Sequence, residues 1–171
     1  MSMEGAINYL ETLGKVLSDH ITEWYVEEGE EPALIFTAPS LYDENTELGY
    51  AVSVIQISEE MILLGIMVTI AAEIPEDRFK DMHGLAEEMN NLAVIGSFTM
   101  FEDTSALICR QGAVFSVGSP LAETTANMIC TIGILESSAS KCRAVAEDIL
   151  SGKLAPENAI DKIMEMRGDA G

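Results

Sequence analysis

Basic side chains are scarce in this sequence. Nine Lys and Arg residues stand against 29 Asp and Glu residues, which gives the 171-residue chain a formal net charge of -20. Nucleic acids and anionic membrane surfaces are bound through Lys and Arg, so this composition excludes both as direct partners. Apolar runs are also short. The longest one, residues 61–72, falls well below the roughly 20 residues that cross a bilayer.

Cysteine is the next scarce residue type. Cys109, Cys130 and Cys142 are odd in number, lie in apolar stretches and lack C-x-x-C spacing. This pattern favours reduced core thiols over disulfides or a zinc site. The first residues of the chain are acidic, whereas a signal peptide begins with Lys or Arg, so we expect a cytoplasmic protein.

Sequence motifs for catalysis, phosphate binding and metal binding are missing as well. There is no G-x-S-x-G, G-x-G-x-x-G or Walker motif. The acidic loop 43–49 has Leu48 and Val54 where a calcium loop needs Gly and Glu, so we expect a solvated loop. We therefore predict neither a cofactor nor a bound metal and no enzymatic activity, although a hydrolase built on paired carboxylates stays open as a weaker alternative.

The two histidines are the remaining candidates for chemistry. His83 and Glu87 are four residues apart on a predicted helix and could hold a metal, but a third ligand is missing at helical spacing, so we expect a surface ion pair. His20 follows the first predicted helix beside Asp19, which suits a helix C-terminus better than a catalytic base.

The acidic residues are unevenly distributed. Residues 1–77 contain sixteen Asp and Glu residues and a single base, Lys15, whereas residues 78–171 contain thirteen acidic and eight basic residues. Two interpretations stay open: solubility through self-repulsion, or a field that steers a basic partner.

Hydrophobic periodicity predicts one α+β domain over residues 1–152 and a C-terminal helical arm, 153–171, that is part of the same domain. The predicted helices are 4–18, 76–90, 122–151 and one beginning at Pro156, and the predicted strands are 22–26, 33–38, 50–57, 61–72, 94–101 and 106–117. The order is α-β-β-β-β-α-β-β-α-α. Short connections predict an antiparallel sheet with helices packed on one face, and residues 61–72 are expected to form a buried strand.

The third predicted helix carries a heptad-like apolar seam. Its members are Met128, Ile132, Leu135, Ala139, Cys142, Ala146 and Ile149. Ile129, Ile134, Val145 and Leu150 widen the apolar surface beyond this seam. The helix is either buried on several sides in its own domain or shared with a second subunit. On the second alternative, Met128, Ile132, Leu135, Ala139, Cys142 and Ile149 form a candidate dimer or partner surface.

Ten methionines offer a weaker signal for binding, because clusters of flexible Met side chains suit surfaces that adapt to apolar ligands. Core filling explains most of them better.

Residues 74–115, IPEDRFKDMHGLAEEMNNLAVIGSFTMFEDTSALICRQGAVF, resemble the YbjN-type domain of sensory transduction regulators, whose fold is shared with the type III secretion chaperones. The resemblance lies in a helix that ends at Asn90, two strands of which the second carries Arg110, and a closing helix after Pro120 and Leu121. It implies a type III secretion chaperone-like α/β sandwich without catalytic residues that acts as a dimer and binds another protein.

The sequence thus predicts a non-enzymatic, homodimeric protein-binding module, chaperone-like or regulatory, that holds a protein or peptide segment, basic if the acidic half steers it. The alternative is a small-molecule or metal-responsive regulatory domain with an enclosed pocket. An accessible apolar groove would favour the first function, and a pocket with convergent polar groups would favour the second.

Overall fold

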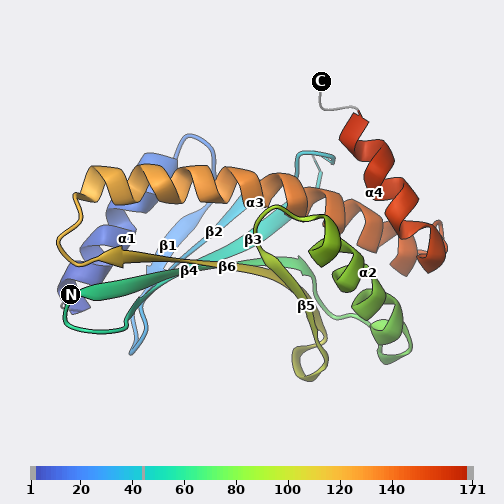
Figure 1. Ribbon diagram of the computed structural model, residues 1–171, viewed down its shortest axis with the longest axis horizontal. Coiled ribbons are helices and arrows are strands. Elements are labelled where there is room, and N and C mark those ends of the chain that lie inside the picture. Colours follow the sequence, from blue (N-terminus) through green and yellow to red (C-terminus); the bar gives the residue numbers. More distant parts are fainter. Residues whose placement is uncertain (1–2, 44, 169–171) are drawn as a thin grey trace.

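The protein is an α+β domain with one antiparallel sheet, as the sequence predicts. The computed structural model describes residues 3–43 and 45–168 (Figure 1). Its elements, in chain order, are α1 (Met3–Leu17), β1 (Trp24–Glu27), β2 (Ala33–Pro39), β3 (Glu47–Gln56), β4 (Met61–Ala71), the 3₁₀ turn η1 (Glu76–Arg78), α2 (Phe79–Leu92), β5 (Ser97–Phe101), η2 (Glu102–Thr104), β6 (Ala106–Ser116), α3 (Leu121–Leu150), η3 (Pro156–Asn158) and α4 (Ala159–Gly168).

All neighbouring strands of the sheet are antiparallel. The strand order is β1-β2-β3-β4-β6-β5, so β6 lies between β4 and β5. The first four strands form a meander, and α2 carries the chain past β6 to the far edge. A bulge interrupts the pairing of β4 with β6 between Thr69 and Ala71, and bulges of this kind bend a sheet locally.

The helices cover one face of the sheet. In Figure 1, α3 runs along the whole sheet, with α1 at one end and α2 and α4 at the other. The side chains that point toward these helices are buried, and they alternate with side chains that point away from them. On β4, for example, the exposed fractions of Leu64, Ile66 and Val68 are at most 1%.

Several boundaries differ from the sequence prediction, and β1 begins at Trp24 instead of residue 22. The strand β3 begins at Glu47, so it takes the last residues of the predicted loop. The helix α2 begins with a 3₁₀ turn and continues to Leu92, so the expected end at Asn90 is wrong. The strand β5 begins at Ser97 instead of Val94.

Asn90 has a different role from ending a helix. Its side-chain amide donates a hydrogen bond to the backbone oxygen of Phe98 (2.9 Å) and accepts one from the backbone nitrogen of Phe98 (2.7 Å). Phe98 lies on the edge strand β5, so Asn90 satisfies backbone groups that no strand pairs with on that side.

The long helix α3 ends as the sequence predicts. Gly152 follows it with φ +75°, a left-handed conformation that glycine adopts without strain. The chain then turns into η3 and α4, where Ala159 and Ile163 are buried in the same hydrophobic core as the rest of the domain.

Candidate functional site

The face of the sheet that points away from the helices is rich in apolar side chains. An antiparallel sheet with one packed face usually shows polar side chains on the other. Here Tyr25, Met67 and Val114 are 58%, 50% and 55% exposed on that face. Met61 is also exposed there, so the prediction of a fully buried strand at residues 61–72 is wrong: every second residue of β4 lacks a cover within the chain. We call this surface the open face.

A row of small residues crosses the open face from strand to strand. Ala33 pairs with Ser53, Ser53 with Gly65, and Gly65 with Gly112, so four neighbouring strands each contribute one of them. A Cβ atom at Gly112 would lie 2.9 Å from Leu63 Cδ1, and one at Gly65 would lie 3.0 Å from Ser53 Oγ. The Leu63 and Ser53 side chains therefore lean over the two glycines, and the row lies lower than its surroundings because none of its residues is larger than serine.

Larger side chains border this row on both sides. One side is formed by Ile35, Met67 and Arg110, with the small Ala51 between Ile35 and Met67, and the other by Ile55, Leu63 and Val114. We call the resulting feature the trough; its floor is the row of Ala33, Ser53, Gly65 and Gly112. A cavity of about 530 Å³ lies over its β3, β4 and β6 part and extends to Gly96 and Ser97 at the start of β5.

The dimensions of the trough follow from strand geometry. Its two borders are four residues apart along each strand, which is about 14 Å, and its floor crosses three strand spacings, again about 14 Å. An α-helix with its side chains is about 10–12 Å wide. The side chains of the two borders take up part of this width, so the trough can receive the apolar side of a helix, two or three turns long, that lies across the strands.

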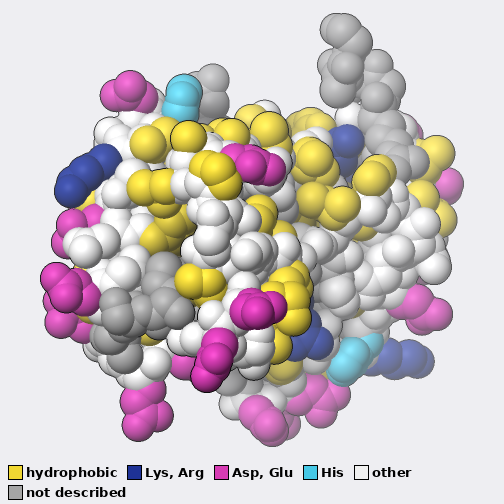
Figure 2. Space-filling model, turned by 60° about the vertical axis from the view of Figure 1, so that its left-hand side comes forward, with side chains coloured by type: hydrophobic (Ala, Val, Ile, Leu, Met, Phe, Trp, Pro, Cys, Tyr) yellow, Lys and Arg dark blue, Asp and Glu magenta, His cyan; other side chains and the backbone are white. Residues whose placement is uncertain are grey.

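Acidic residues lie at one end of the trough and along one of its sides. Glu27 pairs with Ala33 and so stands at the end of the floor. The turns beside the Leu63 border hold exposed glutamates, namely Glu28, Glu30 and Glu31 between β1 and β2, and Glu59 and Glu60 between β3 and β4. Figure 2 views the molecule from another side, on which patches of hydrophobic side chains lie among acidic side chains.

The only Lys or Arg within the six strands is Arg110. Its guanidinium carbon lies 5.7 Å from the centroid of the Phe101 ring, which is a cation–π contact. Apart from Arg110, the trough presents apolar surface and negative charge to a ligand.

The residues of the predicted α3 seam are placed elsewhere. Met128, Ile132, Leu135, Ala139, Cys142, Ala146 and Ile149 are all buried in the core of the single chain. They therefore do not form a free surface, and the structure corresponds to the alternative in which α3 is buried in its own domain. Of the apolar residues beside the seam, Val145 is buried and only Ile134 is exposed.

The three cysteines do not share one environment. Cys109 and Cys142 are buried, as expected, whereas Cys130 on α3 is exposed, so the expectation of three core thiols is wrong for Cys130. Burial raises the pKa of Cys109 to about 12 and that of Cys142 well above its usual value, which makes both thiols unreactive.

The candidate metal pair also has a different partner from the expected one. His83 Nε2 lies 2.9 Å from Glu102 Oε1 on η2, so the predicted ion pair with Glu87 is wrong. Asp43 in the acidic loop accepts hydrogen bonds from the Thr46 hydroxyl (2.7 Å) and the Asn45 backbone (3.0 Å), and these bonds lower its pKa. Within residues 3–43 and 45–168, no group of three or more His, Cys, Asp or Glu side chains could hold a metal ion. No helix in the same ranges is long and apolar enough to cross a membrane.

The trough was not identifiable from the sequence, because its floor depends on the register in which the strands pair. Ser53, Gly65 and Gly112 are far apart in the chain and align only once three strands are paired. The methionines did give a partial signal: Met61 and Met67 lie on the open face, while Met82, Met89, Met100 and Met128 fill the core.

Two comparisons with known proteins give no relative from which a role could be transferred. What the trough binds has to be inferred from its shape, apolar surface and charge. No family model matches the chain, and no curated protein matches it.

Proposed function

We propose that this protein is a non-enzymatic, cytoplasmic protein-binding module whose trough holds a basic, amphipathic helical segment of a partner protein. The observation that carries this proposal is the apolar trough with acidic residues beside it. Contiguous exposed apolar surface marks interaction sites in soluble proteins, and amphipathic helices commonly dock into apolar grooves.

The charge of the chain favours a basic partner over a second copy of the same chain. Two copies that each carry a net charge of -20 repel one another, whereas Lys and Arg beside the apolar side of a bound helix would meet Glu27 and the glutamates of the two turns. Interactions of this kind speed up association and weaken as salt screens them.

The resemblance to YbjN-type domains and type III secretion chaperones supports the same proposal. The expected pattern and this chain share one order of elements: a helix, antiparallel strands, a second helix, two further strands and a long helix. We propose that the chain shares the chaperone-like fold and the chaperone-like role of holding a segment of another protein.

Homodimerisation remains a separate prediction. The buried seam of α3 removes its original basis, and a second copy on the open face would occupy the surface proposed for the partner helix. Light scattering coupled to gel filtration tests it, and because of the charge repulsion we expect any dimer to be favoured by added salt.

A peptide titration tests the proposed function. The probe is a labelled helical peptide of about 14 residues, roughly 20 Å long, with Leu and Met on one side and Lys and Arg on the other. A matched peptide carries Glu in place of every basic residue. By fluorescence anisotropy we expect saturable binding of the basic peptide, weakening with salt, and little binding of the acidic one.

Two matched variants separate binding in the trough from general attraction to an acidic surface. Ser53→Phe fills the floor of the trough, whereas Thr99→Phe adds the same ring to β5 on the same face, outside the trough; neither changes the net charge. We expect Ser53→Phe to weaken binding by at least about tenfold and Thr99→Phe to have little effect. Equal affinities for the two variants would contradict the proposal. Affinity capture from the source cell with wild type and Ser53→Phe, compared by mass spectrometry, then identifies the natural partner.

A further inference from the structure

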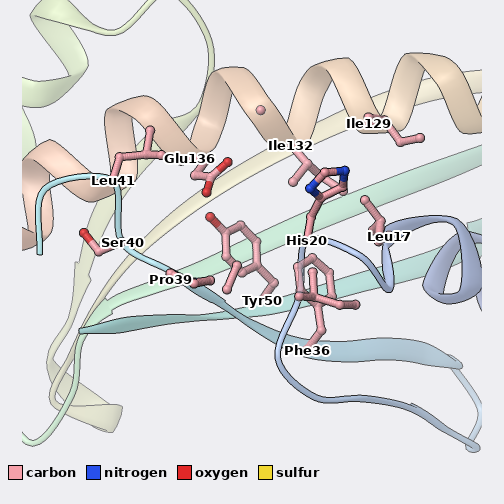
Figure 3. Close-up of a pocket in the computed structure, with 13 residues that line it drawn as sticks. Leu17, His20, Phe36, Pro39, Ser40, Leu41, Tyr50, Ile129, Ile132 and Glu136 are labelled. Atoms are coloured by element: carbon pink, nitrogen blue, oxygen red, sulfur yellow. The ribbon is translucent and has the colours of Figure 1, made fainter. Parts of the chain in front are cut away.

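A second cavity lies on the opposite, helix-covered side of the sheet. It is lined by α3, by β2 and β3, and by the segments that follow α1 and β2, it is partly open to solvent, and its volume is about 360 Å³ (Figure 3). This is within the range of small-molecule sites. Most of its lining is apolar and includes Leu17, Ile21, Phe36, Leu41, Ile129 and Ile132.

The loop that closes this cavity is held in place. The buried hydroxyl of Ser140 on α3 accepts a hydrogen bond from the backbone nitrogen of Leu41 (3.1 Å). On the same loop, the Tyr42 ring lies 5.9 Å from Lys141 Nζ. The wall of the cavity is therefore formed before any ligand arrives, which lowers the cost of ordering it on binding.

The cavity contains a hydroxyl group without a partner. The side-chain oxygen of Tyr50 is buried and has no hydrogen-bond partner among the residues that the structure describes. Its ring stacks on Phe36 at a centroid distance of 4.7 Å, which fixes its direction. Burial raises the pKa of Tyr50, so the group stays neutral. A buried hydroxyl without a partner is destabilising, so a ligand that bonds to it is favoured.

A carboxyl group faces this hydroxyl. Figure 3 shows the Tyr50 oxygen directed toward the carboxylate of Glu136 on α3. Burial raises the pKa of Glu136, and the nearby charge of His20, at the opposite wall, acts against that rise. Two hydrogen-bond acceptors thus converge on an apolar cavity that is lined by both halves of the chain.

We propose that this cavity binds a small apolar molecule that carries one protonated amine. The ammonium group would donate hydrogen bonds to the Glu136 carboxylate and the Tyr50 oxygen, and the apolar body would fill the space between Phe36, Ile129 and Ile132. An anionic head group would instead meet the charge of Glu136 in a low-dielectric site, which is unfavourable. The site is independent of the trough, since Phe36 and Tyr50 point to the other side of the sheet.

Three probes that share the same alkyl chain and differ in the head group test which head group binds: hexylamine, hexanol and hexanoate. Calorimetric titration of the full chain at about pH 8, where an alkylamine is protonated, should show saturable binding of hexylamine, weaker binding of hexanol and no binding of hexanoate. Equal or tighter binding of hexanol or hexanoate overturns the proposed ligand class, and the lack of saturable binding of all three overturns the site.

Two variants test the polar groups, with Glu123→Gln, an exposed change on the same helix, as the control. Glu136→Gln should weaken hexylamine binding by at least about tenfold, and Glu123→Gln should leave it unchanged; equal affinities overturn the role of Glu136. Tyr50→Phe should weaken hexylamine binding while leaving the melting temperature of the free protein equal or higher, because it removes a buried hydroxyl that lacks a partner. Unchanged binding in Tyr50→Phe overturns the role of the hydroxyl.

Discussion

The two faces of the sheet come from alternate residues of the same strands, yet one face is buried and the other is exposed. Leu64 on β4 is completely buried beneath the helices, while Met67, three residues later, is half exposed on the open face. Both faces are apolar. The difference teaches that hydrophobic composition alone does not decide burial: a face is buried only if the chain has an element left to cover it, and all four helices are used on one side.

The largest effect is expected from a charge on the covered side. Leu135 is completely buried, and its side chain fills the space next to Gly96, where a Cβ would lie 2.8 Å from Leu135 Cδ2. Leu135→Glu should abolish the cooperative unfolding transition, because the cost of an unpaired buried charge rivals the whole stability of a domain, about 5–15 kcal/mol. Circular dichroism and urea titration measure it. If the variant instead stayed folded and its mass in solution fell to half that of the wild type, the seam would be a subunit interface.

The sharpest comparison uses two adjacent leucines of β4. Leu64→Ala, on the covered face, should lower the free energy of unfolding by about 2–5 kcal/mol. Leu63→Ala, at the border of the trough, should cost about 1 kcal/mol or less and should instead weaken binding of the basic peptide. Denaturant titration and anisotropy give the two quantities; similar losses of stability would mean that the open face is covered in solution.

Alkaline pH should lower the stability of the protein through groups that are buried on the covered side of the sheet. Burial raises the pKa of Cys109 from an ordinary value of 9.0, and that of Tyr9 from 10.0, to about 12 in each case. The unfolded chain therefore loses these protons first, so the stability present below about pH 9 should fall progressively as the pH rises toward 12. Melting temperatures measured from pH 7 to 11 test this, and a flat profile would contradict the burial of both groups.

The smallest effect is expected at Cys130. This exposed thiol should react with a maleimide in the native protein and change the free energy of unfolding by no more than about 0.5 kcal/mol. Cys109 and Cys142 should react only after denaturation. Mass spectrometry of the labelled protein counts the modified thiols, and rapid native labelling of Cys109 would contradict the assignment of the covered face.

The sequence was informative where the pattern is local. Periodicity placed all four helices and all six strands, and Gly152 marked the end of α3, because these features depend on neighbouring residues. It failed where distant segments meet. Cys130 sits in an apolar stretch of α3 but on its outward side, and His83 meets Glu102, nineteen residues away, instead of Glu87 one turn away.

The candidate site shows the same limit more clearly. The seam of α3 was chosen because it is the most regular apolar pattern in the chain, and regularity of that kind is what a core helix needs. The trough depends on the register that aligns Ser53, Gly65 and Gly112, and the inner cavity depends on a loop that brings Leu41 to Ser140. Neither alignment is encoded within a short window of sequence.

The bond between Asn90 and Phe98 has a consequence for aggregation. A sheet with an exposed edge can grow by recruiting strands from other molecules, and the risk is greatest when one of its faces is apolar. The Asn90 amide occupies the backbone groups of Phe98, the second residue of β5 on that edge, and the opposite edge, β1, has four residues and ends in Glu27. The protein can therefore keep an apolar face available to a partner without offering its own strands as a template for fibres.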